Sequence, residues 1–384
     1  MSPCSWHPKG NSYHLNYLGD PHGYRDLSSL GGELIEMRLI HRPEGLRLGP
    51  LSEKNQAINN NEVNNMKRVL LGVLSVLYFS VAAGADDKIT ISVSGSYSMI
   101  FLSAGIAQKK GFFKQEGLDA DILVMRPATS IAALSSGDID YTMLTGSVIR
   151  AAIAGFPFKV VAGFVNSSPH ALLGRPEFKS VKDLKGRTVG VGNFGSATHV
   201  LARMIIKHFG IDPDKETQII ALGGDAARLA GLQKGLADAA MTSPPWDFEG
   251  KKMGYVILAR AYEFLNYPLS GLGVHARKLQ QKPGEVKRVI KALIKASRFI
   301  RENRNESIQV LAEWGKVPKE HALASYDSTV KVVSMDGTIP GDGLRLLMDE
   351  SRKETKVARE VSVNEVTDFA LLLEAQRELG VKKP

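Results

Sequence analysis

Two stretches of this sequence decide the fold: KITISVSGSYSMIFLSAGIAQKK at residues 88–110 and RTVGVGNFGSATHVLARMIIKHF at residues 187–209. Each opens with a run rich in β-branched residues, which predicts a strand, and continues into a segment with apolar residues at helical spacing. The same alternation continues around both stretches, with strands predicted at 120–125, 140–144, 159–165, 217–222, 237–242 and 269–276 and helices at 130–136, 147–154, 225–234 and 283–303. This pattern predicts doubly wound α/β lobes with parallel strands.

The second stretch repeats the first. At a constant offset of 98 residues, strands, helices and a Gly-x-x-Asp turn fall in register, and identical residues coincide at Thr90 and Thr188, Ala104 and Ala202, Gly137 and Gly235, Asp140 and Asp238, and Met143 and Met241. Any two strand-helix-strand units share part of such a pattern. We nevertheless interpret the halves as two similar lobes that face each other.

The first 85 residues differ in character from the rest. Residues 1–65 contain scattered proline, glycine, histidine and asparagine without periodicity, which predicts a disordered extension or a misassigned start. Residues 66–85 combine Lys67 and Arg68, an apolar run and the ending Ala83-Gly84-Ala85, which predicts a secretory signal peptide. The run is shorter than the ~20 residues that span a bilayer. We therefore expect a mature chain from Asp86 in the periplasm, and no lipid anchor because no cysteine follows the run.

Composition excludes several classes of function. The chain has 384 residues, a net charge of +9, 43% hydrophobic and 23% charged residues, which is typical of a globular protein of about two domains. Cys4 is the single cysteine, so neither a disulfide framework nor a cysteine-rich metal site is possible within the chain. Basic residues are spread along the sequence, which argues against a nucleic-acid partner.

No catalytic motif stands out either. The stretch GVGNFG at 190–195 departs from the dinucleotide-binding fingerprint, and the histidines lack metal-ligand spacing. Neither a P-loop nor a nucleophile elbow occurs. We therefore predict no catalytic residue, no metal ligand and no cofactor.

The predicted binding residues lie directly after the strands, because open α/β sheets bind ligands beyond the carboxyl ends of their strands. They are rich in hydroxyl groups and glycines and stand at helix N-termini, where free N–H groups favour an anion. The set is Ser94, Gly95, Ser96, Tyr97, Thr145, Gly146, Ser147, Gly195, Ser196, Ala197, Thr198, Asp225, Ser243, Pro244 and Trp246.

Each of these residues also has a simpler interpretation. The hydroxyl side chains cap helices in many proteins without any ligand. Tyr97 and Trp246 either stack on a flat ligand or belong to the edge of the core. Asp225 either caps the helix that follows it or contacts an amine or hydroxyl of the ligand.

Four local patterns, taken together, resemble a known family. They are KGFFKQEGLD at 110–119, SGDID at 136–140, VKDLKGRTVGV at 181–191 and GLADAAMTSPP at 235–245. Their order and spacing over about residues 88–315 are similar to the periplasmic substrate-binding proteins of ABC importers, in the nitrate/sulfonate/taurine and thiamine-precursor (NMT1/THI5-like, SsuA-like) group.

The resemblance implies a type II periplasmic-binding fold with two chain crossovers. Lobe 1 is then expected at 86–181 and 264–384 and lobe 2 at 182–263, with hinges near Ser180 and Phe264. It further implies ligand capture by closure of the lobes, a permease partner in the inner membrane and a monomeric protein. Family ligand contacts would fall on 94–97, 145–147, 196–198 and 243–244.

The sequence leaves the ligand open. The loops after the strands carry no cation, whereas Arg126, Arg150 and Arg175 lie near strand ends and either reach the cleft or stay on the surface. A neutral or mono-anionic organic ligand, carboxylated or aromatic, is therefore at least as well supported as an inorganic anion. The alternatives are an enzyme resembling the synthase of the thiamine-precursor pyrimidine, and a ligand sensor for a signalling receptor. A transcription-factor effector domain is disfavoured because residues 1–85 contain no helix-turn-helix pattern.

Overall fold

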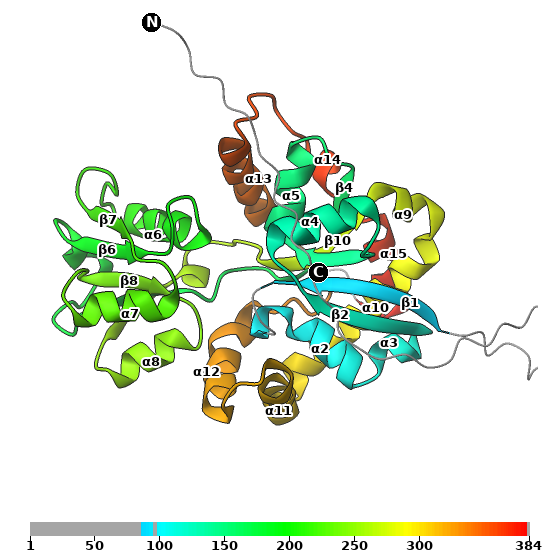
Figure 1. Cartoon of the computed structure of the whole chain (residues 1–384), viewed down its shortest axis with the longest axis horizontal. Helices are drawn as coiled ribbons and strands as arrows, with labels where there is room; N and C mark the ends of the chain where they lie inside the picture. The colour runs from blue at the N-terminus through cyan, green and yellow to red at the C-terminus, as the bar shows by residue number, and fades with distance from the viewer. Residues whose placement is uncertain (1–85, 95–97, 382–384) are drawn as a thin grey trace, which may run out of the picture. The chain divides into compact units, whose positions relative to one another are not determined.

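Two five-stranded sheets form two lobes of the chain. The computed structural model describes residues 86–94 and 98–381, so the predicted extension and signal peptide lie outside the described residues. One sheet has the strand order β2-β1-β3-β10-β4 and the other has β7-β6-β8-β5-β9 (Figure 1). We call the parts built on these sheets lobe 1 and lobe 2. The two-lobed α/β architecture predicted from the sequence is confirmed.

Every predicted strand is present, whereas β5 and β9 were not predicted from the sequence. In lobe 1 the strands are β1 (Asp87–Val93), β2 (Leu118–Val124), β3 (Tyr141–Leu144), β4 (Phe158–Val165) and β10 (Ser270–His275). In lobe 2 they are β5 (Ala171–Gly174), β6 (Thr188–Val191), β7 (Gln218–Ala221), β8 (Ala239–Thr242) and β9 (Val256–Arg260).

The helices lie between these strands and after β10. Lobe 1 contains α2 (Leu102–Lys109), α3 (Phe112–Gln115), α4 (Pro127–Ser136), α5 (Thr145–Ile153), α9 (Ala276–Gln281), α10 (Pro283–Glu302), α11 (Arg304–Gly315), α12 (Lys319–Thr329), α13 (Gly341–Thr355), α14 (Val363–Val366) and α15 (Ala370–Glu378). Lobe 2 contains α6 (Ala197–His208), α7 (Asp225–Gln233) and α8 (Trp246–Lys252). Short 3-10 helices occur at Met99–Phe101, Val181–Leu184, Ala261–Glu263 and Val330–Val332. Within residues 86–94 and 98–381, no helix has the length and apolar character of a membrane span.

The internal repeat is confirmed at the level of strand register. In lobe 1, Ile91 pairs with Tyr141, and in lobe 2 the positions 98 residues later, Val189 and Ala239, pair in the same way. The aspartate of the Gly-x-x-Asp turn has the same task in both lobes. Asp140 accepts a hydrogen bond from the N–H of Thr90 at 2.8 Å, and Asp238 accepts one from the N–H of Thr188 at 3.0 Å.

The sheets are mixed, which differs from the all-parallel prediction. β10 runs antiparallel to β3 and β4, and β5 runs antiparallel to β8 and β9. Both exceptions are the strands that the chain forms directly after it crosses from one lobe to the other. Each therefore enters its sheet from the opposite end, and its direction is reversed relative to its neighbours.

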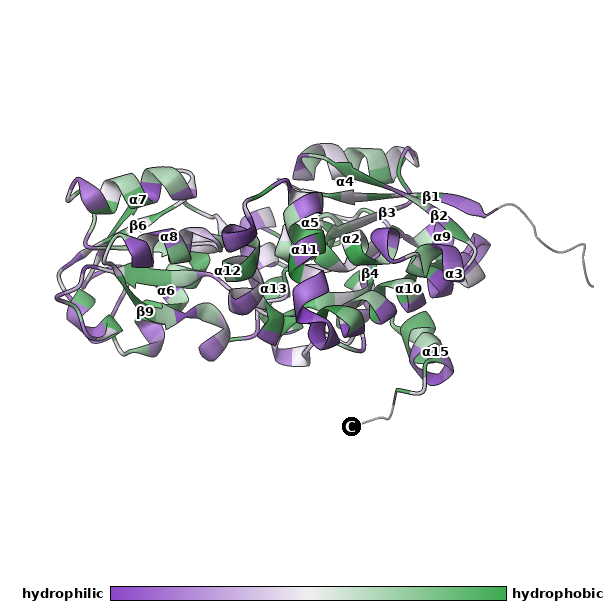
Figure 2. Ribbon diagram, turned by 90° about the horizontal axis from the view of Figure 1, so that it is seen from below, coloured by the Kyte–Doolittle hydropathy of each residue, from purple (hydrophilic) through white to green (hydrophobic). Residues whose placement is uncertain are grey.

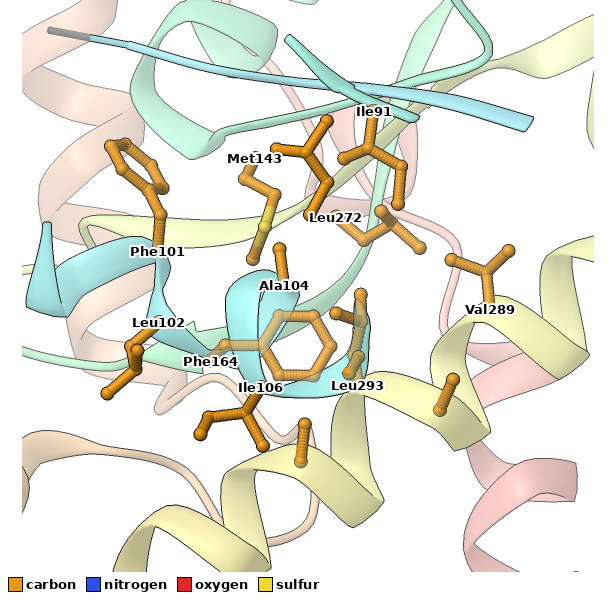
Figure 3. Packing of buried hydrophobic residues seen from close by; sticks show 14 of the residues in the cluster. Ile91, Phe101, Leu102, Ala104, Ile106, Met143, Phe164, Leu272, Val289 and Leu293 are labelled. Carbon is orange, nitrogen blue, oxygen red and sulfur yellow. The ribbon is translucent and has the colours of Figure 1, made fainter. Parts of the chain in front are cut away.

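The core of lobe 1 lies between its sheet and the helices α2 and α10. Ile91, Met143 and Leu272 of three neighbouring strands point toward Ala104 of α2, and Val289 and Leu293 of α10 lie beside α2 in the same cluster (Figure 3). Hydrophobic residues dominate the strands, whereas hydrophilic residues gather on outward helix turns (Figure 2). This burial fixes the sheet and leaves the loops after the strands to carry the polar groups.

Two crossover segments join the lobes, one before β5 and one before β10. They are tied together by the buried Ser167, whose hydroxyl donates a hydrogen bond to the carbonyl oxygen of Leu265 at 2.6 Å. β5 already pairs within the sheet of lobe 2, ahead of the expected hinge at Ser180. The exact lobe boundaries and hinge residues remain a prediction.

Candidate ligand-binding site

A cavity of about 540 Å³ lies where loops of both lobes meet, and we call it the Trp246 cavity. Lobe 1 contributes the start of the 3-10 helix after β1 and the faces of α11 and α12, and lobe 2 contributes the loops before α7 and α8. The lining residues are Ser98, Met99, Ile100, Pro169, His170, Asp225, Ser243, Pro244, Pro245, Trp246, Glu249, Leu269, Leu311, Val317, His321, Ser325 and Thr329. The structure thus brings four of the predicted site residues together: Asp225, Ser243, Pro244 and Trp246.

Asp225 organises the lobe 2 side of this cavity. Its carboxylate accepts hydrogen bonds from the N–H of Ser243 at 2.8 Å and from the hydroxyl of Ser243 at 2.7 Å, and it is bonded to the guanidinium of Arg228. Gly224, rather than Asp225, occupies the N-cap position of α7, so the predicted capping role is wrong. The reason is that Arg228, one turn further along α7, holds the carboxylate toward the loop after β8.

Arg228 is the charged group that sequence reasoning missed. It is only 4% exposed, and its Nε donates to the carbonyl oxygen of Met241 at 2.5 Å while another nitrogen bonds the carbonyl oxygen of Gly223. These contacts join the ends of β7 and β8, because Gly223 follows β7 and Met241 lies in β8. The guanidinium is engaged by protein acceptors, which limits its use as a counter-ion for a ligand anion.

His170 supplies a neutral ring to the cavity wall. Its Nδ1 lies 2.6 Å from the hydroxyl oxygen of the buried Ser168, and that oxygen also accepts the N–H of His170 at 3.4 Å. The Ser168 hydroxyl thus contacts both the ring and the backbone of His170. Desolvation, with help from Arg228, lowers the pKa of His170 to about 4 against the opposing effect of Asp225. No motif in the sequence signals this residue.

The remaining residues of the first predicted loop are only partly described. Ser94 is half-buried and directly follows β1, whereas Gly95, Ser96 and Tyr97 lie outside the described residues. Trp246, at the start of α8, is 36% exposed and lines the cavity with Pro244 and Pro245. Whether Trp246 stacks on a ligand stays a prediction.

The start of α6 lines a different cavity, of about 780 Å³, which we call the α6–α13 cavity. Gly195, Ser196 and Ala197 are the predicted site residues there. The full lining is Arg150, Gly195, Ser196, Ala197, His199, Val200, Arg203, Met204, Lys207, Pro213, Tyr267, Leu346, Glu350, Ser351, Lys353 and Glu354. The predicted site residues are thus divided between two cavities.

The hydroxyl groups at the start of α6 act as local caps. Ser196 is the N-cap residue and accepts the N–H of His199 at 3.4 Å. Thr198 is buried, and its Oγ1 accepts the N–H of Gly192 at 2.9 Å. His199 in turn accepts the N–H of Gly195 at 3.1 Å, and desolvation lowers its pKa. The simpler capping interpretation is therefore observed for Ser196, and ligand contact remains a prediction.

The start of α5 is placed apart from both cavity linings. Thr145 is fully buried with no hydrogen-bond partner for its Oγ1, and Gly146 follows it in the first turn. Ser147 is half-buried, and its hydroxyl oxygen accepts a long bond from Arg150 at 3.4 Å. Ligand contact by these three residues remains a prediction.

Of the three arginines near strand ends, one lines either the Trp246 cavity or the α6–α13 cavity. Arg150 lines the α6–α13 cavity and lies 3.5 Å from Glu354. Arg175 pairs with Asp238 at 3.4 Å, and Arg126 is exposed at the start of α4. Within the described residues, one group of acidic and histidine side chains is close enough to share a metal ion: the possible ligand atoms of Glu249, Glu320 and His321 all lie within 4.8 Å of one another.

The fold defines the class of protein. The two lobes have the same strand order and are joined by two crossovers, and loops of both lobes line the cavity between them. This arrangement is a periplasmic-binding type of fold. The chain belongs to the NMT1/THI5-like family, whose profile matches residues 101–307, more than half of its length.

Three comparisons show what this chain is similar to. A Brucella abortus protein, provisionally named a binding protein, is 26% identical over 259 residues, which is 66% of this chain and 80% of that protein. The 4-amino-5-hydroxymethyl-2-methylpyrimidine phosphate synthase of Saccharomyces cerevisiae is 30% identical over 141 residues, covering 35% of this chain and 41% of the enzyme. The crystal structure of the periplasmic aliphatic sulphonate binding protein of Escherichia coli superposes with a TM-score of 0.61 at 19% identity, covering 75% of this chain and 99% of that one.

Proposed function

We propose that this protein is the periplasmic solute-binding component of an ABC-type importer, which captures a small organic ligand between its lobes. The observation that carries the proposal is the Trp246 cavity, whose lining comes from both lobes. A solute that contacts both lobes binds the closed arrangement more tightly than the open one and shifts the population toward closure. The closed protein then delivers the solute to a permease in the inner membrane.

The cavity chemistry favours a neutral or weakly polar ligand with a flat apolar part. Trp246, Met99 and Leu311 offer apolar contact, whereas Ser243 and His170 offer hydrogen bonds. Arg228 is bonded to Asp225 and to two carbonyl oxygens. A ligand sulfonate or nitrate in this cavity would therefore compete with existing partners for the guanidinium. We expect uncharged heteroaromatic or hydroxylated compounds to bind more tightly than small inorganic anions.

A ligand screen by thermal shift tests the proposal. Carboxylates, sulfonates, nitrate, pyrimidines and aromatic compounds are added singly to the full chain. A compound present at 100 times its dissociation constant adds about 2.7 kcal/mol to stability. Trp246→Ala should weaken binding of the best compound, whereas Trp314→Phe, a variant of a tryptophan outside the cavity lining, should bind it normally. If no compound raises the melting temperature, the solute-binding function fails.

The partial match to the pyrimidine synthase supports one rival function, an enzyme acting on a related compound. The match covers 41% of the synthase, so its activity does not transfer to this chain. Mass spectrometry of each screening hit after incubation with the protein distinguishes solute capture from an enzymatic reaction. Unchanged compound recovered after many protein equivalents supports capture, and a new product supports the enzyme.

A further inference from the structure

A row of polar contacts joins α8 of lobe 2 to α12 of lobe 1. The Nε2 of His321 lies 2.9 Å from Oε1 of Glu249, and Nζ of Lys252 lies 3.1 Å from Oε2 of Glu320. Further along α12, the hydroxyl of Ser328 donates to Oδ2 of Asp247 at 3.1 Å. We call these six residues of the two helices the α8–α12 seam.

Each helix of the seam is fixed to its own lobe. On the lobe 1 side, the hydroxyl of the buried Tyr326 donates to the carbonyl oxygen of Ile300 in α10 at 2.6 Å. On the lobe 2 side, Asp247 is 1% exposed and bonded to Arg260 of β9 at 2.7 Å. Motion of one lobe against the other must therefore break the seam contacts, because α8 moves with lobe 2 and α12 moves with lobe 1.

The seam also borders the Trp246 cavity, since Glu249 and His321 belong to the lining of that cavity.

The seam pairs opposite charges of the two helices, as in the contact of Lys252 with Glu320. Desolvation raises the pKa of Glu249, but hydrogen bonds from His321 and Lys252 outweigh this effect and lower the pKa overall. A hydrogen bond from Lys252 to Glu320 raises the pKa of Lys252. Glu249 and Lys252 therefore both stay charged, which is the state in which these contacts hold.

We propose that the α8–α12 seam is a latch: it holds the two lobes together at this side of the Trp246 cavity, and its opening admits the solute. The proposal rests on the lobe motion that the proposed function requires, but it does not depend on which solute binds. Exposed ion pairs change an equilibrium only modestly, by up to about fivefold each. A latch of this strength stabilises closure and still releases at ambient temperature.

The test measures the distance between the lobes without any solute. Spin labels are attached at Lys109→Cys in lobe 1 and Lys215→Cys in lobe 2, both exposed, in the full chain with Cys4→Ser. Pulsed electron paramagnetic resonance then gives the distance distribution. Glu320→Ala with His321→Ala removes two latch partners from α12, and we expect the ratio of long to short distances to rise by roughly five- to tenfold.

The matched control lies on the same helix. Asp327 of α12 pairs with Arg304 of α11 at 2.8 Å, entirely within lobe 1, so Asp327→Ala removes an ion pair without touching the seam. It should leave the distribution unchanged, and His321→Gln, which keeps a donor for Glu249, should shift it less than His321→Ala. Lys252→Ala tests the seam from the lobe 2 side.

The latch is refuted if the double variant and Lys252→Ala both retain the distribution of the unaltered protein. It is equally refuted if Asp327→Ala shifts the distribution as far as they do. The distance measurement uses no ligand, so the two proposals can fail separately. If the ligand screen fails but the seam variants still change the distance distribution, only the transport proposal is refuted.

Discussion

Replacing Arg228 by methionine should destabilise lobe 2 and disorganise the Trp246 cavity. The guanidinium is 4% exposed and bonds the carboxylate of Asp225 and the carbonyl oxygens of Gly223 and Met241. Methionine fills the volume of the aliphatic stem but removes the charge and every one of these donors. Asp225 then keeps the two bonds from Ser243 and loses its counter-ion.

The magnitude follows from the burial of Arg228 and the partial burial of Asp225. Removing one partner of a fully buried ion pair costs about 3–5 kcal/mol, because the remaining charge is left uncompensated. The Asp225 side chain is 19% exposed, so we expect a cost at the lower end, about 3 kcal/mol. Removing both charges costs much less, so Asp225→Asn combined with Arg228→Met should lose only about 1–2 kcal/mol, mainly from the two carbonyl oxygens left without a donor. The expected coupling between the sites is therefore about 2 kcal/mol or more.

Urea unfolding of the full chain, followed by tryptophan fluorescence and circular dichroism, gives these free energies. The midpoint should fall for Arg228→Met with little change in the slope, and it should recover in the double variant. The reasoning is refuted if Arg228→Met costs less than about 1 kcal/mol, or if the double variant is no more stable than the single one.

Three shorter predictions follow from packing and charge. Gly105→Ala should cost about 1–3 kcal/mol in urea unfolding, because its Cβ would lie 2.7 Å from the ring of Trp314, whereas Gly284→Ala, with no atom within 4 Å, should be nearly neutral. Burial raises the pKa of Glu285, but hydrogen bonds from Lys278, Tyr141 and Lys282 outweigh this effect and lower the pKa overall. The stability lost in Glu285→Gln should therefore be greatest above pH 4.5 and shrink as the pH falls through the folded-state pKa, and a pH-independent loss would contradict this. The ring of His170 should stay neutral until about pH 4 in a nuclear magnetic resonance titration, and protonation near pH 6.5 would contradict the desolvation that lowers its pKa.

The repeated architecture was predictable because it depends on local signals. Strand and helix periodicity depends on neighbouring residues, and the offset that matches Thr90 with Thr188 and Asp140 with Asp238 is visible in the letters alone. In the structure the same four residues form the same hydrogen bond in both lobes. The capping of α6 by Ser196 is local in the same way, since a hydroxyl needs only the N–H groups of the next turn.

The composition of the cavities was only partly predictable, because it also depends on residues that only the crossovers and the late helices bring together. His170 comes from a crossover segment, and His321 of α12 meets Glu249 across 72 positions of sequence. In the sequence, Arg228 cannot be distinguished from an exposed arginine on a helix; only the fold buries it beside Asp225. The sequence by itself thus determined the strand-helix order and the duplication, through periodicities a few residues long. Which polar groups are paired, neutral or shared between lobes was decided only by the tertiary structure, because burial and charge pairing depend on distances in space.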